Sequence, residues 1–239
     1  MTKILYMKDI ESNYIKEFKS IVITNKKDYI SLEKTAFYPE GGGQPSDIGT
    51  IYWNDKKAEI IKVIKKGDTI KHIIDGEKPK NGTEIFAKIN WEKRYAHMKM
   101  HTAQHILSGI IFDKYNARTV GNQIHSDYSR VDFYPITFTD KDLRYIKNKF
   151  NNIVSKNLPI TIYNKKREKL EKKVNQQRAD LDLLPKFIKN LRIVEIKDFD
   201  ICPCAGTHVK NTSEIPKIGN IKRDTKGKDK DRIIYSFEE

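Results

Sequence analysis

The hydrophobic pattern of this chain changes its period close to residue 90, and this change limits what the chain can fold into. Before that point, short apolar or alternating stretches are separated by Gly, Asp and Asn, and they cover residues 20–24, 29–32, 49–53, 58–64, 70–74 and 84–89. Several short strands at regular spacing predict a small β-barrel or sandwich. Its last strand is expected to end near Asn90.

A long helix is predicted directly after this β segment. Residues 91–115 contain strong helix formers, an acidic residue in the first turn and an apolar stripe through Met100, Ala103, Ile106, Leu107, Ile110 and Ile111. Later patterns predict a β hairpin over 119–134, a helix over 140–155, strands over 160–163 and 191–196, and strands over 218–237 that bend at 226–228. Residues 164–182 are polar enough to form a solvated helix or to be mobile. We therefore predict an α+β protein with a small β-barrel-like domain over residues 1–90 and an α/β sandwich domain over residues 91–239.

The balance of charges favours a polyanionic partner. Lys and Arg together number 46 against 32 Asp and Glu, which gives a formal net charge of +14 in a chain of 239 residues. Each phosphate that such a surface neutralises releases condensed counterions, so nucleic acid is the first partner to test. The alternative is a basic surface that only reflects a Lys-, Asn- and Ile-rich proteome. Charge alone does not distinguish RNA from DNA.

The apolar segments are too short for a membrane protein. No apolar run approaches the roughly 20 residues that a bilayer span needs, and the opening MTKILYMKDI reaches charged residues before a secretory signal could form. With 33% charged residues, the chain is expected to be a cytoplasmic protein without a membrane partner.

Two pairs of side chains have the spacing of metal ligands. His101 and His105 lie four residues apart on the predicted helix, so both imidazoles can point to one ion. Cys204 and His208 form a Cys-x-x-x-His sequence, in which Gly206 permits a tight backbone path. One thiolate and three imidazoles suit tetrahedral zinc better than Mg²⁺ or Ca²⁺, which prefer oxygen ligands. We therefore predict one Zn²⁺ per chain.

Each half of this predicted site has a structural alternative. His105 could be a hydrogen-bonded core histidine, and Cys204 could be a small buried apolar residue. His97 extends the histidine series, but about 12 Å of helix separates it from His105, so it is left out of the ligand set. His72 and His125 stand alone in the sequence and are expected to be surface or packing residues. Cys202 and Cys204, with one residue between them, are poorly placed to form a disulfide with each other.

The glycine run at residues 41–43 does not form a nucleotide-binding P-loop. The pattern Gly-x-x-x-x-Gly-Lys-Ser/Thr is absent and no helix clearly follows, so no nucleotide cofactor is expected. The glycines are expected to let a loop pack closely against a pocket or an RNA end, with Phe37 and Tyr38 as a hydrophobic or stacking wall.

These motifs, taken together, resemble the AlaX family, which consists of free-standing relatives of the alanyl-tRNA synthetase editing domain. The resemblance spans almost the whole chain and rests on residues 41–49 (GGGQPSDIG), 101–105 (HTAQH) and 204–209 (CAGTHV), with further agreement at 121–123 (GNQ), 129–133 (SRVDF), 226–228 (KGK) and 232–233 (RI). With the glycine-rich motif in front, the chain is similar to the medium-length class. The resemblance implies an N-terminal β domain and a zinc-containing editing domain. It also implies hydrolysis of mischarged tRNA(Ala), chiefly Ser-tRNA(Ala) and in some members Gly-tRNA(Ala).

This activity places defined demands on the site. Hydrolysis of the aminoacyl ester at the tRNA 3′ end needs an oriented water molecule and stabilisation of the developing oxyanion. Zinc could lower the pKa of a bound water toward about 7, but four protein ligands are typical of a closed, structural zinc site. One hypothesis is that a histidine ligand is loosely held or displaced by substrate. The other is that zinc only shapes the pocket while Gln123, a position that fits the family pattern, acts as the catalytic residue that orients water.

Selectivity requires a site that recognises the serine hydroxyl, because Ser-tRNA(Ala) and Ala-tRNA(Ala) differ by that group alone. A site built to hydrogen-bond a hydroxyl can reject its absence by roughly 10⁴-fold. Thr102, Thr119 and Gln123 are the candidates. Gly206 and Thr207 of the Cys-x-x-x-His motif are added as substrate-binding residues. Thr102 could instead form a hydrogen bond within its own helix.

Two other functions stay open. A non-catalytic tRNA-binding protein with a structural zinc would bind tRNA without cleaving the ester. An editing deacylase for Ser-tRNA(Thr) is the second alternative, because the threonyl-tRNA synthetase editing domain shares the His-x-x-x-His and Cys-x-x-x-His pairs.

Overall fold

The computed structural model describes residues 2–170 and 187–238, and it divides into two compact units, Met1–His97 and Met98–Glu239. The predicted domain boundary between residues 90 and 91 falls where helix α1 (Trp91–Tyr115) begins. This helix starts in the first unit and continues into the second. The domain boundary itself stays a prediction.

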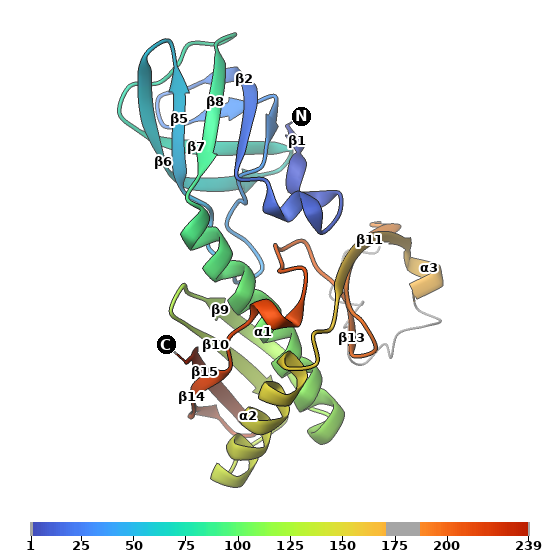
Figure 1. Cartoon of the computed structure of the whole chain (residues 1–239). Helices are drawn as coiled ribbons and strands as arrows, with labels where there is room; N and C mark the ends of the chain where they lie inside the picture. The colour runs from blue at the N-terminus through green and yellow to red at the C-terminus, as the bar shows by residue number, and fades with distance from the viewer. Residues whose placement is uncertain (1, 171–186, 239) are drawn as a thin grey trace. The chain divides into compact units, whose positions relative to one another are not determined.

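The first unit contains a closed barrel of six strands (Figure 1). The order around the barrel is β2 (Glu17–Asn25), β3 (Ile30–Leu32), β7 (Thr69–Asp75), β6 (Lys56–Lys66), β5 (Gly49–Trp53) and β8 (Glu84–Ile89). Neighbouring strands are antiparallel throughout. The predicted β-barrel is confirmed, and its strands coincide with the six alternating stretches of the sequence. A short parallel pair, β1 (Lys3–Ile4) with β4 (Lys34–Thr35), was not predicted.

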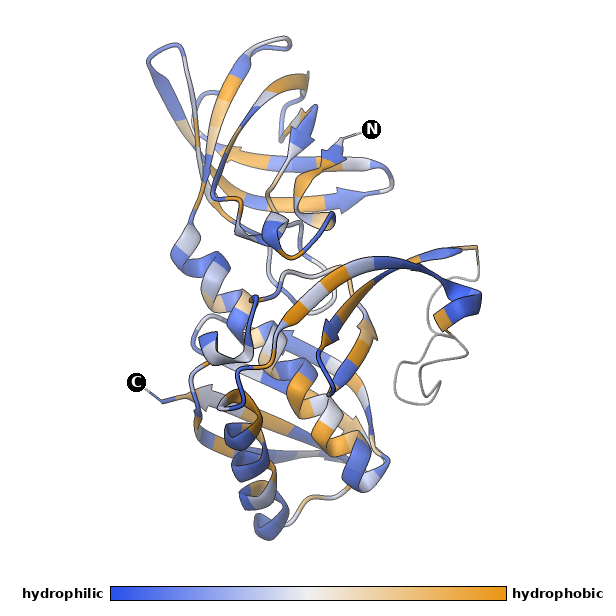
Figure 2. Cartoon of the chain, turned by 45° about the vertical axis from the view of Figure 1, so that its right-hand side comes forward, coloured by the Kyte–Doolittle hydropathy of each residue, from blue (hydrophilic) through white to orange (hydrophobic). Residues whose placement is uncertain are grey.

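Alternation along the strands makes the barrel core. In β2 the side chains of Phe18, Ser20 and Val22 are buried, and the residues between them are exposed. Hydrophobic and hydrophilic residues alternate in the same way along the other barrel strands (Figure 2). Gly49 is required where β5 pairs with β8, because a Cβ atom there would lie 2.2 Å from the carbonyl oxygen of Lys88.

The glycine-rich loop forms a tight turn. Gly41 and Gln44 exchange two backbone hydrogen bonds of 3.1 and 2.9 Å, and Gly42 and Gly43 between them have φ angles of 56° and 81°. Two successive positive φ angles favour glycine strongly. Phe37, which was predicted as part of a wall toward a pocket or RNA, is fully buried in the barrel core instead.

A buried ion pair fixes this loop to the start of α1. Arg94, in the first turns of α1, donates to the carboxylate of Asp47 and to the backbone oxygens of Asn13 and Ala36. Asp47 also accepts a hydrogen bond of 2.6 Å from the backbone N–H of Tyr38. The side chains of Arg94 and Asp47 are 0% and 1% exposed. The acidic residue of the glycine-rich motif therefore has a structural partner.

The second unit contains an antiparallel sheet covered on one face by helices. The strand order is β14 (Ile218–Gly227), β15 (Lys230–Phe237), β10 (Tyr128–Tyr134) and β9 (Arg118–Ile124). Ile124, Val131, Ile233 and Tyr235 point to the covered face and are buried. α1 and α2 (Asp140–Val154) lie over this face (Figure 2). The Tyr235 hydroxyl donates a hydrogen bond of 2.8 Å to a backbone oxygen of α1.

A second sheet of this unit brings the C-terminal motif into place. Its order is β11 (Ile160–Lys166), β12 (Asn190–Ile196) and β13 (Asp200–Pro203), all antiparallel. β13 was not predicted. The polar segment 164–182 begins as the end of β11 and as α3 (Arg167–Leu170), and its remainder lies outside the described residues.

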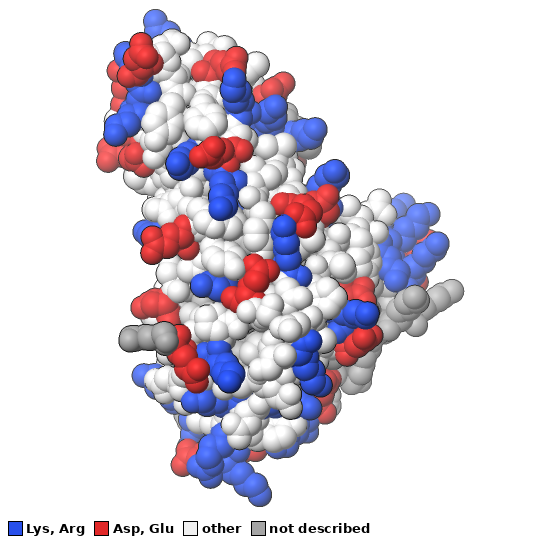
Figure 3. All heavy atoms as spheres, viewed as in Figure 1, with Lys and Arg blue, Asp and Glu red and all other residues white. Residues whose placement is uncertain are grey.

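Charged residues of both signs are interspersed over the face of the molecule shown in Figure 3.

In the part of the chain that the structure describes, no helix has both the length and the apolar character needed to cross a membrane.

Candidate metal centre

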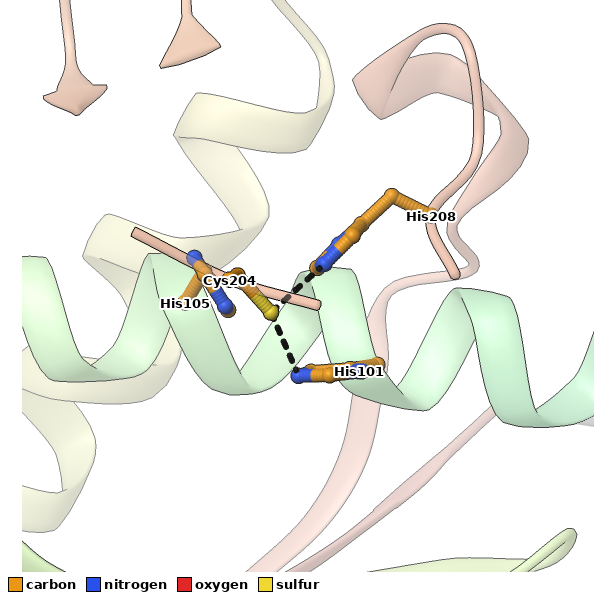
Figure 4. Close-up of side chains that lie close together, drawn as sticks. All are labelled: His101, His105, Cys204 and His208. Carbon is orange, nitrogen blue, oxygen red and sulfur yellow. Dashed lines mark hydrogen bonds between the residues drawn. The ribbon is translucent and has the colours of Figure 1, made fainter. Parts of the chain in front are cut away.

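Four side chains from two distant parts of the sequence meet at one point. The ligand atoms of His101, His105, Cys204 and His208 all lie within 4.8 Å of one another. Figure 4 shows the two histidines of α1 facing Cys204 and His208. The structure therefore brings together the residues of both predicted metal-ligand pairs, and His97 is not part of this group.

Helix α1 supplies one half of the cluster. His101 and His105 are 3% and 6% exposed, and their ring centroids are 5.3 Å apart. A spacing of four residues places both rings on one face of a continuous helix. No local distortion of α1 is needed to aim the two imidazoles.

The segment after β13 supplies the other half. The backbone of Cys204 continues the β13 ladder, because its N–H donates to Arg192 O over 3.1 Å and its oxygen accepts from Arg192 Nη1 over 2.6 Å. The N–H of Gly206 points back to Cys204 Sγ over 3.3 Å. This tight turn returns the chain so that His208 faces the sulfur, with 3.4 Å between Nε2 and Sγ.

The charges within the cluster favour a thiolate. Burial would raise the pKa of Cys204, but the nearby His101 and His208 lower it well below its usual value. Burial, followed by the charge of His101, lowers the pKa of His208. Burial also opposes a charge on His105, yet the Asp200 carboxylate and the Cys204 sulfur outweigh it and raise that pKa to about 10. The lowered pKa values favour a thiolate at Cys204 and a neutral imidazole at His208, the forms in which these side chains bind a metal.

The donor set is therefore compatible with a single metal ion. One sulfur and three nitrogens converge, and the sulfur lies 3.6 Å from His101 Nε2 as well as 3.4 Å from His208 Nε2. Such separations suit ligands held about 2.0 to 2.3 Å from one central ion. Cys202 forms no disulfide bond and is not part of this group.

Thr102 contacts the cluster from within the helix. Its hydroxyl is fully buried, lies 2.9 Å from the Met98 oxygen as a hydrogen-bond donor, and lies 3.1 Å from His208 Nδ1. The Val209 N–H also donates to it over 3.3 Å. The hydrogen bond within the helix, the alternative for Thr102, is present. Its assignment to serine recognition stays a prediction.

Thr119 belongs to a row of polar side chains that are joined by hydrogen bonds. Its hydroxyl lies 2.7 Å from that of Ser108, which accepts a hydrogen bond of 3.0 Å from Gln104 Nε2. Asn122 of β9 donates to Gln104 Oε1 over 3.3 Å. Gln104 directly precedes His105 on α1, so this row starts next to a metal-ligand candidate.

Gln123 is not brought to the cluster. Asn122 points to α1, and successive residues of a strand point to opposite faces, so Gln123 points to the other face of the sheet. There it accepts a hydrogen bond from Arg130, its direct partner on β10. The catalytic assignment of Gln123 stays a prediction, and its side chain contacts Arg130 on the face of the sheet opposite α1.

The remaining candidates lie in the tight turn itself. Gly206 and Thr207 are buried between Cys204 and His208. His72 packs inside the barrel with its Nε2 2.9 Å from the Thr35 hydroxyl, which is a structural role.

Sequence reasoning missed two residues that contact the cluster. Arg192 clamps the backbone of Cys204, and Asp200 places Oδ2 3.4 Å from His105 Nδ1. No sequence pattern indicated the role of Arg192, because its partner is a backbone oxygen, which every residue has. Asp200 could have been noticed as a carboxylate four residues before Cys204, on the same face of an extended strand.

Two known families match parts of the chain. Residues 4–93 match the family of tRNA synthetases class II (A), and residues 191–234 match the second additional domain of threonyl and alanyl tRNA synthetases. The chain thus belongs to a class of proteins that share domains with aminoacyl-tRNA synthetases.

Individual relatives narrow this class. The chain is 39% identical to the alanyl-tRNA editing protein AlaX-M of Methanosarcina barkeri over 99% of both chains. It is 35% identical to AlaX-L of Pyrococcus horikoshii over 99% of this chain and 58% of that one. An alanine–tRNA ligase of Thermococcus kodakarensis is 32% identical over 98% of this chain and 26% of the ligase. The chain belongs to the AlaX family of alanyl-tRNA editing proteins.

Proposed function

We propose that this protein hydrolyses the ester bond of mischarged tRNA(Ala), acting in trans as an aminoacyl-tRNA deacylase. The observation that carries the proposal is the convergence of the four candidate ligands, which come from the two motifs by which the chain resembles the AlaX family. A row of hydrogen-bonded hydroxyl and amide groups begins at Gln104, the residue before His105 on α1. Its substrates are Ser-tRNA(Ala) first and Gly-tRNA(Ala) second.

The polar row of Gln104, Ser108 and Thr119 is the part of the site that we assign to the serine hydroxyl. These groups are mutually hydrogen-bonded, and Thr119 is partly exposed on β9, an edge strand of its sheet. A serine hydroxyl can join such a chain as both donor and acceptor. An alanine side chain would leave a polar group of the row without its partner, which disfavours hydrolysis of correctly charged tRNA.

The ion that we assign to His101, His105, Cys204 and His208 is Zn²⁺, because this sulfur and nitrogen donor set is typical of zinc. When bound, zinc would supply positive charge beside the scissile ester and tie α1 to the 204–208 turn. The chain's own contribution is to hold the four ligands in a buried, preorganised arrangement and to present the polar row next to them.

A deacylation panel tests the proposal. The purified protein is given Ser-tRNA(Ala), Gly-tRNA(Ala), Ser-tRNA(Thr) and Ala-tRNA(Ala), first as isolated, then after chelation, and then after restoration with Zn²⁺. We expect Ser-tRNA(Ala) to be hydrolysed at least about 100-fold faster than Ala-tRNA(Ala). We also expect the rate to fall after chelation and to return with zinc.

The panel separates the alternatives. A non-catalytic tRNA-binding zinc protein would bind all four tRNAs without releasing an amino acid. An editor of Ser-tRNA(Thr) would prefer that substrate to Ser-tRNA(Ala), and this result would overturn the assignment to tRNA(Ala).

A further inference from the structure

We propose that Thr102 and Asp200 are positioning residues that keep the ring proton of two ligand histidines, His208 and His105, on Nδ1, so that Nε2 is the atom that binds the metal. The proposal rests on the zinc site of the proposed function, but its test does not rest on deacylation. Neither residue supplies a ligand atom to the cluster. Each acts through the second ring nitrogen of a histidine that does.

The hydrogen bonds of Thr102 define one ring nitrogen of His208. A hydroxyl has one proton, and the Met98 oxygen at 2.9 Å can only accept it. The Thr102 oxygen therefore acts as an acceptor toward His208 Nδ1 at 3.1 Å, as it does toward the Val209 N–H. Nδ1 of His208 then carries the ring proton. Its Nε2, 3.4 Å from Cys204 Sγ, keeps the lone pair that binds a metal.

Asp200 has the same effect on His105. When it is ionised, the carboxylate can accept a proton but has none to donate. Its Oδ2 lies 3.4 Å from His105 Nδ1, and both side chains are almost fully buried, with 5% and 6% exposure. Nδ1 of His105 has no hydrogen-bond partner within the described residues, so the nearby carboxylate acts through its charge, which favours the ring proton on Nδ1. A carboxylate behind a metal-binding imidazole also makes the imidazole a better ligand.

The placement of Asp200 links this role to the fold. Asp200 opens β13, and Cys204 directly follows the same strand. β13 thus carries a ligand at one end and the partner of a second ligand at the other. Thr102 links the two halves in the opposite sense, because it lies on α1 and contacts His208 of the turn. Each half of the cluster therefore orients a histidine of the other half.

The energetic consequence concerns metal affinity. In a buried site a histidine in the wrong tautomer directs an N–H at the ion, so binding would require the proton to move first. Preorganised outer partners remove this step, and their loss typically weakens metal binding about 10- to 100-fold. We expect losses in this range when either partner is removed.

The test measures Zn²⁺ affinity by competition with a chromophoric chelator at fixed pH. Thr102→Val keeps the shape and removes the hydroxyl, whereas Thr102→Ser keeps the hydroxyl. Asp200→Ala removes the acceptor, and Asp200→Asn keeps an acceptor oxygen without the charge. We expect Thr102→Val and Asp200→Ala to bind zinc about 10- to 100-fold more weakly than the parent protein. Thr102→Ser is expected to retain the zinc affinity of the parent protein. The zinc affinity of Asp200→Asn is expected to lie between that of Asp200→Ala and that of the parent.

Matched controls separate positioning from general destabilisation. Thr212 is also fully buried, donates to Val154 O over 3.3 Å and accepts from the Leu158 N–H over 2.9 Å, but it makes these bonds away from the cluster. Asp231 is a fully buried carboxylate that accepts from the Phe138 N–H. Thr212→Val and Asp231→Asn are expected to lower stability while leaving the zinc affinity of the folded protein unchanged.

A spectroscopic readout keeps the inference testable if a variant does not fold. In the zinc-loaded parent protein, proton–nitrogen correlation NMR is expected to show His105 and His208 protonated at Nδ1 and metal-bound at Nε2. Protonation at Nε2 of either ring would overturn the proposal without any variant. The Co²⁺-loaded protein is expected to change its visible absorption in Thr102→Val but not in Thr212→Val.

The outcomes distinguish this inference from the proposed function. If the parent protein binds no zinc, the zinc site of the proposed function fails. If the parent binds zinc tightly and Thr102→Val and Asp200→Ala bind it equally well, only the positioning role is wrong.

Discussion

Two cysteines lie within three residues of each other, and only one of them has its sulfur among three imidazoles. Cys204 Sγ is 3.4 and 3.6 Å from two histidine nitrogens, whereas Cys202 Sγ is directed to the Pro203 oxygen. We therefore expect Cys204→Ala to abolish the binding of one Zn²⁺ per chain, measured by metal analysis after dialysis. Cys202→Ala is the matched control and should retain the metal. Equal zinc content in both variants would mean that the cluster is not the site.

The polar row of Gln104, Ser108 and Thr119 leads to a second prediction about a single residue. Thr119→Val removes the hydroxyl that lies 2.7 Å from Ser108 and keeps the shape of the side chain. Because one hydrogen bond contributes about 1 kcal/mol or more to discrimination, kcat/KM for Ser-tRNA(Ala) should fall roughly 10-fold. Thr119→Ser should retain most of the rate. Thr225→Val, at an exposed position of β14, serves as the control, and an equal loss there would remove the support for Thr119.

The residues of the site differ in how far the sequence alone could place them. His101, His105, Cys204 and His208 were predicted because helical spacing and a short motif restrict where their side chains can point. Gln123 was assigned to the pocket although the buried Ile124 beside it already fixes the covered face of the strand. The contact of Thr102 with His208 joins residues about 100 positions apart, and no local pattern encodes it. Asp200 had one local indication, its place on the same strand face as Cys204, but its contact with His105 is equally nonlocal.

The same contrast holds for the secondary structure elements. The barrel strands and α1 were predicted because alternation with a period of two, and an apolar stripe with a period near 3.6, persist over many residues. β13 was missed because it covers only Asp200–Pro203, ends in proline and pairs with β12 on one side. Its existence depends on β12, which is a nonlocal partner. That short strand nevertheless carries the chain into the metal-ligand motif.

The attachment of the glycine-rich loop to α1 depends on one buried ion pair. Breaking a buried pair leaves an uncompensated charge, so Asp47→Ala should lower the free energy of unfolding by about 3–5 kcal/mol, measured by urea denaturation. The exposed pair Lys56–Glu77 provides the comparison, and Glu77→Ala should change stability by less than about 1 kcal/mol. Similar losses in both variants would contradict the structural role of Asp47.

An ion pair between two strands leads to a prediction about pH. The hydrogen bond from Arg232 on β15 lowers the pKa of Asp132 on β10. A carboxylate with a lowered folded-state pKa stabilises the protein above its unfolded pKa of about 3.9, and this contribution is lost as the pH falls through the folded value. Asp132→Asn should therefore cost roughly 1.5–3 kcal/mol near pH 7, and the difference from the parent protein should shrink below about pH 4. A difference that stays constant with pH would exclude this role.

At the scale of the whole molecule, the net charge of +14 should control the affinity for tRNA rather than the chemistry of deacylation. Basic and acidic residues are interspersed on the face shown in Figure 3, so only part of the excess can contact phosphates at once. If about four phosphates are neutralised, affinity should fall roughly 100-fold between about 50 and 200 mM salt. Filter binding or anisotropy with tRNA(Ala) over a salt series measures the slope. Hydrolysis of a seryl ester of adenosine, which has no phosphate backbone, should change little over the same series. A flat binding curve, or an equal salt effect on both substrates, would show that the basic surface does not serve RNA binding.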